Sequence, residues 1–408
     1  MEEPEIRLRY STIVNYLSVL YRLLTSLGFV IIIGRRLPVE EFGLWGVILS
    51  LLLMVSYFTS FWDFWSQRFH LRGIENSFNT GLVLTLLYII PGSVAYTLLA
   101  YLAYMVLGWG LEYLLIGLLI LPLYLLVKYI EAALSAIKPE AIGYRYIIYE
   151  TTRLFTAILL VMILSTGLIG ALASMGISML ISLLYGIAVL RPFKVLSLKF
   201  VSGLVKEWAK GFHVPLLNSL AGSLEGGLRA VTSWITGSEV PVAYLNIGMG
   251  VQTPILRASW SSSLALYPRI MKYKKGEDVT ETLRIYLLIS GFMFVSLISL
   301  SRGIVSLYNP KYLMAYPILI VVAIYSVILG LNSIFFTVLR AADEVDREGT
   351  IDYRKMVGSY LFKIPLLRLG IIALGYGLGI SMVFLARGDH ILEAIGMLSG
   401  LLISSSIL

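Results

Sequence analysis

Charged side chains inside long apolar stretches are the residues of this sequence whose chemistry needs an explanation. An ionisable group within a membrane span is costly, and it usually faces the interior of a helix bundle or a water-filled cavity. The apolar stretches contain these ionisable residues: Arg22, Lys128, Glu131, Glu150, Arg153, Glu225, Arg229, Arg257, Lys363, Arg368 and Glu393. Cations outnumber acids in this set, so an anionic ligand is the first chemistry to consider.

Spacing predicts which of these charges neutralise one another. Residues three or four apart lie on the same face of a helix and can form ion pairs. Three pairs have that spacing: Lys128 with Glu131, Glu150 with Arg153, and Glu225 with Arg229. Some of these long side chains also lie close enough to a span end to reach the cytoplasmic surface.

Arg22 and Arg257 lie near the middle of their spans, and neither has an acid three or four residues away. Arginine binds phosphate through two parallel hydrogen bonds, so we expect these residues to hold a phosphate-bearing group in a cavity. The candidate substrate-binding residues are Arg22, Arg229, Arg257, Arg153 and Lys128.

The sequence contains no recognisable catalytic motif. The three histidines, His70, His213 and His390, are scattered at span ends, and cysteine is absent, so we expect no metal site. There is no phosphate-cradling glycine loop and no serine-elbow motif. We therefore expect a protein that is not an enzyme and has no cofactor, and nothing points to nucleic acid.

Composition places the chain in a lipid bilayer. Hydrophobic residues make up 58% and charged residues 14%, with a mean hydropathy of +0.86. An aqueous fold of this length could not bury so much apolar surface. The sequence predicts an all-α polytopic membrane protein with about twelve spans, at about 12–34, 42–61, 78–106, 111–136, 143–164, 166–190, 212–235, 241–266, 283–301, 314–338, 357–386 and 390–408.

The distribution of lysine and arginine predicts the orientation. The N-terminus and the even-numbered loops carry twenty such residues, and the odd-numbered loops carry five. Cytoplasmic loops are enriched in lysine and arginine, so we expect both termini to be cytoplasmic, in the cell membrane. All loops on the external side are short, which leaves no room for an external catalytic domain.

Two similar hinges divide the chain. The polar hinge 35–45 has a counterpart at 235–244, in which Glu40 matches Glu239 and Trp45 matches Tyr244. Both hinges follow an outward-running span, which predicts a parallel duplication about an axis normal to the membrane. We expect a six-helix N-terminal lobe over 1–200 and a six-helix C-terminal lobe over 201–408.

The chain resembles the polysaccharide (Wzx-type) lipid-linked oligosaccharide flippases of the MOP exporter superfamily, which also includes the MATE drug exporters. The likeness spans nearly the whole chain. The hinge and its repeat carry it, together with Leu266-Tyr267-Pro268-Arg269 and the re-entry at 307–317. One departure is Leu228, where many relatives have an aspartate before the arginine, so a coupling role cannot be carried over there.

The resemblance implies two lobes around a cavity that opens alternately to each side, lined with basic residues in relatives that move lipid pyrophosphate sugars. Arg22 and Arg257 are the local counterparts by location. The expected function is translocation of a polyprenyl-phosphate- or pyrophosphate-linked oligosaccharide from the cytoplasmic to the outer leaflet. Its partners would be that substrate, the bilayer and glycan-assembly proteins.

Three alternatives remain open. A MATE-like cation-coupled exporter of small organic molecules predicts unpaired acids in the cavity. A membrane-embedded glycosyltransferase or polymerase predicts a long external loop or an acidic catalytic pair. The third alternative is a structural scaffold that does not transport.

Overall fold

Helices make up nearly all of the described chain, as a bilayer demands, because only helices and closed barrels satisfy their backbone groups there. The computed structural model describes residues 8–71, 73–250, 252, 255–256, 277–342, 357–386 and 388–406. Within these ranges the secondary structure is helical and contains no strand. The prediction of an all-α fold is confirmed.

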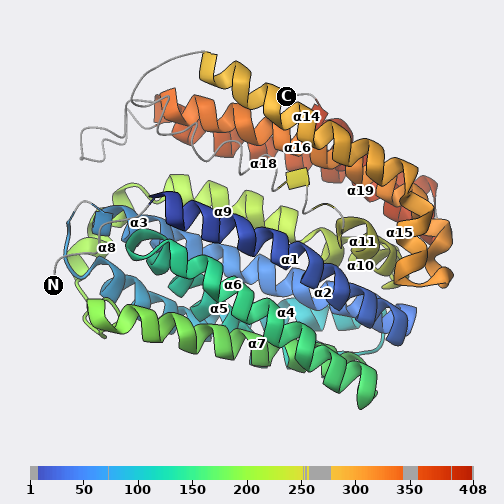
Figure 1. The fold of residues 1–408 in the computed structure, drawn as a ribbon, viewed down its shortest axis with the longest axis horizontal. Coiled ribbons are helices and arrows are strands. Elements are labelled where there is room, and N and C mark those ends of the chain that lie inside the picture. Colours follow the sequence, from blue (N-terminus) through green and yellow to red (C-terminus); the bar gives the residue numbers. More distant parts are fainter. Residues whose placement is uncertain are drawn as a thin grey trace. The chain divides into compact units, whose positions relative to one another are not determined.

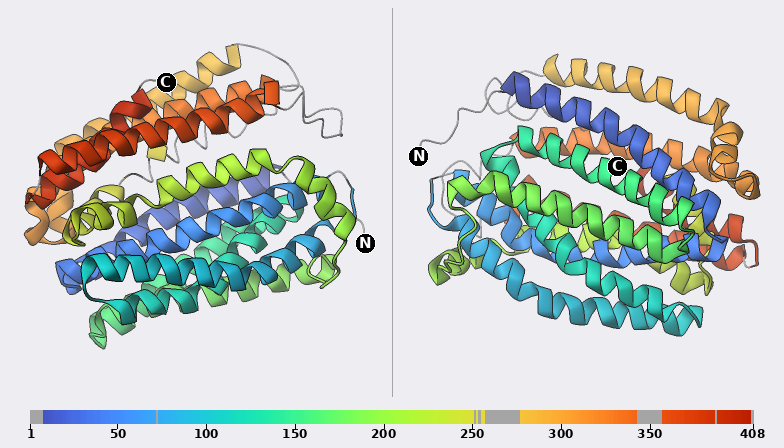
Figure 2. Two further views of the ribbon diagram at one scale, coloured as in Figure 1. Left: turned by 180° about the vertical axis from the view of Figure 1, so that it is seen from behind. Right: turned by 60° about the horizontal axis from the view of Figure 1, so that its bottom comes forward.

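The chain forms two compact units, Met1–Ala230 and Val231–Leu408. This division reflects which residues pack together and does not test the lobe ranges 1–200 and 201–408, which stay a prediction. The elements of the first unit are α1 (Leu8–Arg36), α2 (Val39–Ser56), η1 (Tyr57–Thr59), α3 (Ser60–Leu71), α4 (Ser77–Leu107), α5 (Leu111–Ile137), α6 (Glu140–Ala157), η2 (Ile158–Ile163), α7 (Gly167–Leu190), η3 (Arg191–Phe193), α8 (Ser202–Lys210) and α9 (His213–Gly226). Its long helices lie side by side (Figures 1 and 2).

The helix α10 (Leu228–Thr236) crosses the boundary between the units. The second unit then contains α11 (Val240–Gly250), α14 (Glu277–Ser299), α15 (Ser301–Tyr308), η4 (Pro310–Ala315), α16 (Tyr316–Ala342), α18 (Tyr360–Leu385) and α19 (His390–Ser406). Eight helical segments of the described chain are long and apolar enough to cross a membrane, so the protein is a multi-pass membrane protein.

The helix α2 is the buried centre of the first unit. It packs against α4, α5, α7 and α9, and most of its residues are buried. A helix that is apolar all round can be covered by lipid or by other helices, and for α2 it is the other helices that cover it. The helices α4, α5, α7 and α9 are arranged around it, and α6 packs outside them against α1 and α7.

The predicted span 212–235 is not one continuous helix, because α9 ends at Gly226 and α10 begins at Leu228. Ser50 of α2 stabilises the interruption: its hydroxyl donates to the Gly226 carbonyl (2.5 Å) and accepts from the Ala230 N–H (3.3 Å). A Cβ atom at Gly227 would lie 2.9 Å from Met54 Sδ and from the Ser223 carbonyl oxygen. The interruption therefore depends on a close approach to α2 that glycine permits.

Both predicted hinges are short turns between two helices. The first lies between the end of α1 at Arg36 and the start of α2 at Val39, and the second lies between α10 and α11. In the first hinge, Glu41 accepts a hydrogen bond from the Leu168 N–H at the start of α7 (3.0 Å). A carboxylate at a helix N-terminus is stabilised by the helix dipole, so this hinge is a structural joint.

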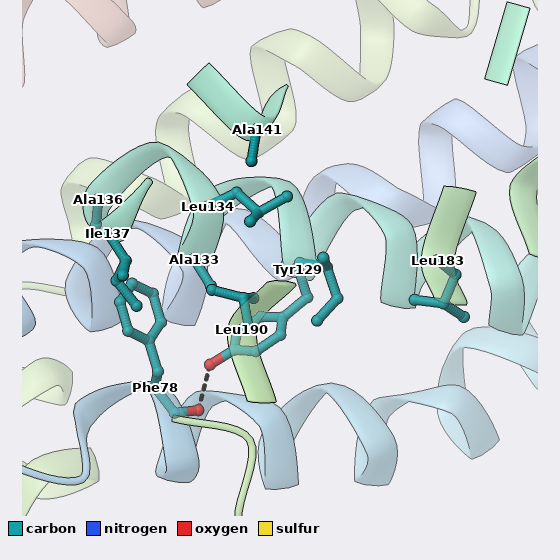
Figure 3. Packing of buried hydrophobic residues seen from close by; sticks show 10 residues of the cluster. Phe78, Tyr129, Ala133, Leu134, Ala136, Ile137, Ala141, Leu183 and Leu190 are labelled. Atoms are coloured by element: carbon teal, nitrogen blue, oxygen red, sulfur yellow. Dashed lines mark hydrogen bonds between the residues drawn. The ribbon is translucent and has the colours of Figure 1, made fainter. Parts of the chain in front are cut away.

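One hydrophobic cluster closes the end of the first unit where α4 begins and α7 ends (Figure 3). We call it the α4–α5–α7 core. The Tyr129 hydroxyl donates to the Phe78 carbonyl at its centre, so the polar end of a buried tyrosine is satisfied. The cluster comprises Phe78, Tyr129, Ile130, Ala133, Leu134, Ala136, Ile137, Ala141, Leu183 and Leu190.

In the second unit, α18 and α19 pack backbone to backbone. Gly375 and Gly379 on α18, four residues apart, face Gly400 on α19, and Gly396 on α19 lies against Met382 and Val383. A Cβ atom at Gly400 would lie 2.3 Å from the Gly379 nitrogen and 2.4 Å from the Gly375 oxygen. Small residues at this spacing allow membrane helices to approach closely.

We predict that Gly400→Ala destabilises the protein by about 1–3 kcal/mol, because the added methyl group meets backbone atoms that cannot rotate away. Thermal unfolding in detergent measures the effect. The matched control is Gly377→Ala, since a Cβ there has no atom within 4 Å. Equal melting temperatures for the two variants would contradict the close packing.

Candidate functional site

The strongest concentration of buried charge lies where α1 packs along α6. Helical spacing brings the polar residues of each helix to one face, at i, i+3 or i+4, and i+7. The residues are Arg22, Ser26 and Phe29 on α1, and Tyr146, Tyr149, Glu150 and Arg153 on α6. We name Arg22, Ser26, Glu150 and Arg153 the arginine–glutamate cluster.

Glu150 is the centre of this cluster. Its Oε2 lies 2.5 Å from Arg153 Nη2, and its Oε1 lies 3.3 Å from Arg22 Nε. Ser26 bridges the same groups, since its hydroxyl donates to Glu150 Oε1 (3.1 Å) and accepts from Arg153 Nη2 (3.0 Å). The predicted Glu150–Arg153 pair is confirmed, and the prediction of an unpaired Arg22 is wrong because its acid comes from another helix.

The two arginines differ in how firmly they are held. The Arg153 side chain is 14% exposed and its guanidinium lies over the Phe29 ring (4.5 Å). The Arg22 side chain is 30% exposed, makes the longer contact to Glu150 and lies over the Tyr146 ring (4.7 Å). Of the three charged side chains in the cluster, Arg22 is the most exposed, and Glu150 is only 1% exposed. Arg22 is therefore the charged group most accessible to another anion.

A second network adjoins the first through Tyr146. Its hydroxyl donates to Glu131 of α5, and Arg145 Nη2 lies 2.6 Å from the other oxygen of that carboxylate. Arg145 also donates to the Ser182 hydroxyl on α7 (3.2 Å). The predicted Lys128–Glu131 pair is therefore wrong, because Arg145 and Tyr146 occupy the Glu131 carboxylate.

Together the two networks contain three arginines, Arg22, Arg145 and Arg153, and two glutamates, Glu131 and Glu150. One positive charge remains after pairing. Since Arg145 is 2% exposed and Arg153 is tightly paired, the surplus is most available at Arg22. An arginine in this state can bind a phosphate through its free N–H groups.

Lys128 lies elsewhere in the first unit. Its ammonium donates to the Ser56 carbonyl (2.8 Å), at the point where α2 gives way to η1, and lies 4.8 Å from the centre of the Tyr57 ring. Near this turn Asp63 is buried and accepts from the Thr59 hydroxyl (2.7 Å). The structure does not bring Lys128 into the arginine–glutamate cluster, and its role in binding stays a prediction.

Arg229 lies in α10, directly after the interruption at Gly226 and Gly227. The predicted pairing of Glu225 with Arg229 assumed that both residues lie on one continuous helix. In the structure Glu225 lies in α9 and Arg229 lies in α10. The buried Arg229 Nε has no hydrogen-bond partner among the described residues. Arg257 lies outside the described residues, so its placement stays a prediction.

Two buried charges of the first unit were not expected from the sequence. Arg145 falls inside the predicted span 143–164 but was not among the ionisable residues singled out there, and α6 holds its side chain buried. Asp63 was placed beyond a span end, but the apolar helical segment extends to Gln67. The signal available for Arg145 was its position inside the predicted span 143–164.

Metal binding has no support in the described ranges, where no group of three or more histidine, aspartate or glutamate residues could hold an ion. The arginine–glutamate cluster itself offers charge and hydrogen bonds to a ligand. The cationic surplus favours an anionic partner.

Solved structures match the fold along almost the entire chain. An outward-facing multidrug resistance MATE family transporter of the MOP superfamily matches with a TM-score of 0.63 at 13% identity, covering 98% of this chain and 92% of that chain. An inward-facing one matches with a TM-score of 0.61 at 11% identity, covering 97% and 96%. The Vibrio cholerae MATE transporter VcmN in its bent form gives 0.57 at 14%, covering 98% and 93%.

At such identities these matches establish the fold alone. The protein has an all-α fold like that of the MATE transporters, as the sequence predicted. No protein-family model and no curated protein sequence matches the chain.

We predict that Glu131→Gln destabilises the protein by about 3 kcal/mol, because it leaves the buried Arg145 without its carboxylate. Urea or thermal unfolding in detergent measures the loss. The matched control is Glu207→Gln, which breaks the exposed Lys210–Glu207 pair (2.6 Å) and should change stability by less than about 1 kcal/mol. Equal losses in both variants would show that Arg145 does not depend on Glu131.

Proposed function

We propose that this protein is a flippase that moves a polyprenyl-phosphate- or pyrophosphate-linked oligosaccharide from the cytoplasmic to the outer leaflet. The arginine–glutamate cluster receives the phosphate of the headgroup, while the lipid tail remains in the bilayer. The protein acts in the cell membrane, with both termini cytoplasmic and with glycan-assembly proteins as its partners.

The observation that carries this proposal is the surplus positive charge that Arg22 presents. Its contact with Glu150 is single and 3.3 Å long, and its side chain is 30% exposed. A phosphate offers several charged oxygens and can engage a guanidinium bidentately, which the one Nε contact does not. Phosphate can therefore bind Arg22 while Glu150 retains its 2.5 Å contact with Arg153.

The fold supports a transport cycle for this substrate. Its neighbours among solved structures include inward-facing and outward-facing conformations of transporters with the same fold. Alternation between such states would expose a bound headgroup first to one side and then to the other. Arg229 and Arg257 would contribute further positive charge to the headgroup, with Arg153 and Lys128 in supporting positions.

A MATE-like cation-coupled exporter of small organic molecules is the second candidate, and the solved neighbours favour it by their own description as MATE transporters. An exported cation needs an acid that is free to bind it. Glu150 is buried, but two arginines already engage it. The net positive charge of the cluster therefore favours a phosphate-bearing substrate over an organic cation.

We predict that Arg22→Gln lowers the rate of headgroup translocation in proteoliposomes by about ten-fold or more, because a charge-assisted hydrogen bond contributes about 1.5–3 kcal/mol. The assay uses a fluorescent polyprenyl-pyrophosphate oligosaccharide and an impermeant quencher. Arg36→Gln is the matched control, since Arg36 is exposed at the end of the same helix.

Normal translocation by the double variant Arg22→Ala, Arg257→Ala would overturn the site assignment. The same vesicles loaded with a fluorescent organic cation test the alternative. Cation export by the wild type, with no translocation of the lipid-linked sugar, would favour the MATE-like function.

A further inference from the structure

The segment between α7 and α9 is a firmly anchored surface rather than a loose connection. We call residues 191–210 the basic linker. Its Phe193, Val195 and Leu196 side chains pack against the α4–α5–α7 core. At its other end, Trp208 of α8 is fully buried and its ring lies edge-on to Phe69 (6.1 Å). Both ends of the linker are therefore held by the first unit.

Two hydrogen bonds fix the middle of the linker to α4. The Ser197 N–H donates to Asn79 Oδ1 (2.8 Å), and the Val201 N–H donates to the Thr80 hydroxyl (3.2 Å). Asn79 and Thr80 lie in the first turn of α4, a helix that is long and apolar enough to cross the membrane. The linker thus lies beside the N-terminal end of α4, and Figure 1 shows α8 at the same end of the helices of the first unit. Because a spanning helix ends close to the bilayer surface, we infer that the linker lies there too.

The outer side of this anchored segment carries exposed apolar residues. Leu198 is 72% exposed, Phe200 is 50% exposed and Val201 is 37% exposed. The neighbouring Phe193, Val195 and Leu196 pack against the α4–α5–α7 core. The linker therefore has one set of apolar side chains facing the protein and a second set of three facing outward. Apolar side chains held at the bilayer boundary lower the free energy by entering the lipid interface.

Lysines and an arginine accompany these apolar residues. The exposed basic residues are Arg191, Lys194, Lys199, Lys206 and Lys210. The acid Glu207 is engaged by Lys210 (2.6 Å), which leaves the other four cations to define the charge of the surface. Lysine at this depth places its stem along apolar groups and its ammonium among phosphates.

We propose that the basic linker binds the headgroup layer of the leaflet on its own side of the membrane, with a preference for anionic lipids. Leu198, Phe200 and Val201 enter the interface, and the lysines contact lipid phosphates. This surface is separate from the arginine–glutamate cluster and does not depend on which substrate is transported. It fixes the segment that joins the last span of the first predicted lobe to α9.

The absence of cysteine from the sequence makes the proposal directly testable. A Phe200→Cys variant carries one label, an environment-sensitive fluorophore, in the full-length protein. The variant is reconstituted into phosphatidylcholine vesicles with or without phosphatidylglycerol, and with lipids brominated in the upper tail as quenchers. Glu75→Cys is the control, because Glu75 is an exposed position in the turn before α4.

We expect the label at position 200 to shift to shorter wavelength and to be quenched by brominated lipid, more strongly when phosphatidylglycerol is present. Adding Lys194→Gln, Lys199→Gln and Lys206→Gln should weaken the lipid-bound population roughly five-fold for each lysine removed. The label at position 75 should not respond to phosphatidylglycerol in this way.

Two results would overturn the proposal. In the first, the label at position 200 stays in water in both kinds of vesicle. In the second, its quenching is the same without phosphatidylglycerol and is unchanged by the three lysine substitutions. Melting temperatures of the labelled variants in detergent establish that the linker substitutions leave the fold intact.

Discussion

The contact of Glu150 with two arginines constrains both the packing of α1 on α6 and the charge that the site presents. A carboxylate that is 1% exposed inside a span is stable only when it is paired and hydrogen-bonded. Arg153 supplies the tight pair, and Arg22 and Ser26 supply the remaining contacts from α1. Separating α1 from α6 would therefore leave a buried charge uncompensated.

The same contact explains how a membrane protein can keep a cationic site without a ligand. Glu150 neutralises one of the two arginine charges, and Tyr146 joins the cluster to the Arg145–Glu131 pair. Only one positive charge is left, and it lies on the side chain with the longest contact and the greatest exposure. In our proposal this charge selects a phosphate-bearing headgroup over an organic cation.

The hydropathy pattern predicted the helical spans and the hinges because both depend on local composition. The partner of Arg22 could not be predicted, since helix periodicity relates residues of one helix and Glu150 belongs to another. Lys128 was paired with Glu131 wrongly because helical spacing relates residues of one helix, whereas the partners of Glu131, Arg145 and Tyr146, belong to α6. The interruption at Gly226 and Gly227 was also missed, since glycine alone is tolerated in membrane helices and Ser50 of α2 is needed to stabilise the break.

The most direct test of the central claim compares two lipids that differ only in charge. The affinity of the purified protein for polyprenyl pyrophosphate is measured against its affinity for the uncharged polyprenol of the same length, in wild type and in Arg22→Gln. The account predicts that the wild type binds the pyrophosphate more tightly and that the substitution removes much of this preference. Equal affinity for the two lipids, or a preference that Arg22→Gln leaves unchanged, would contradict it.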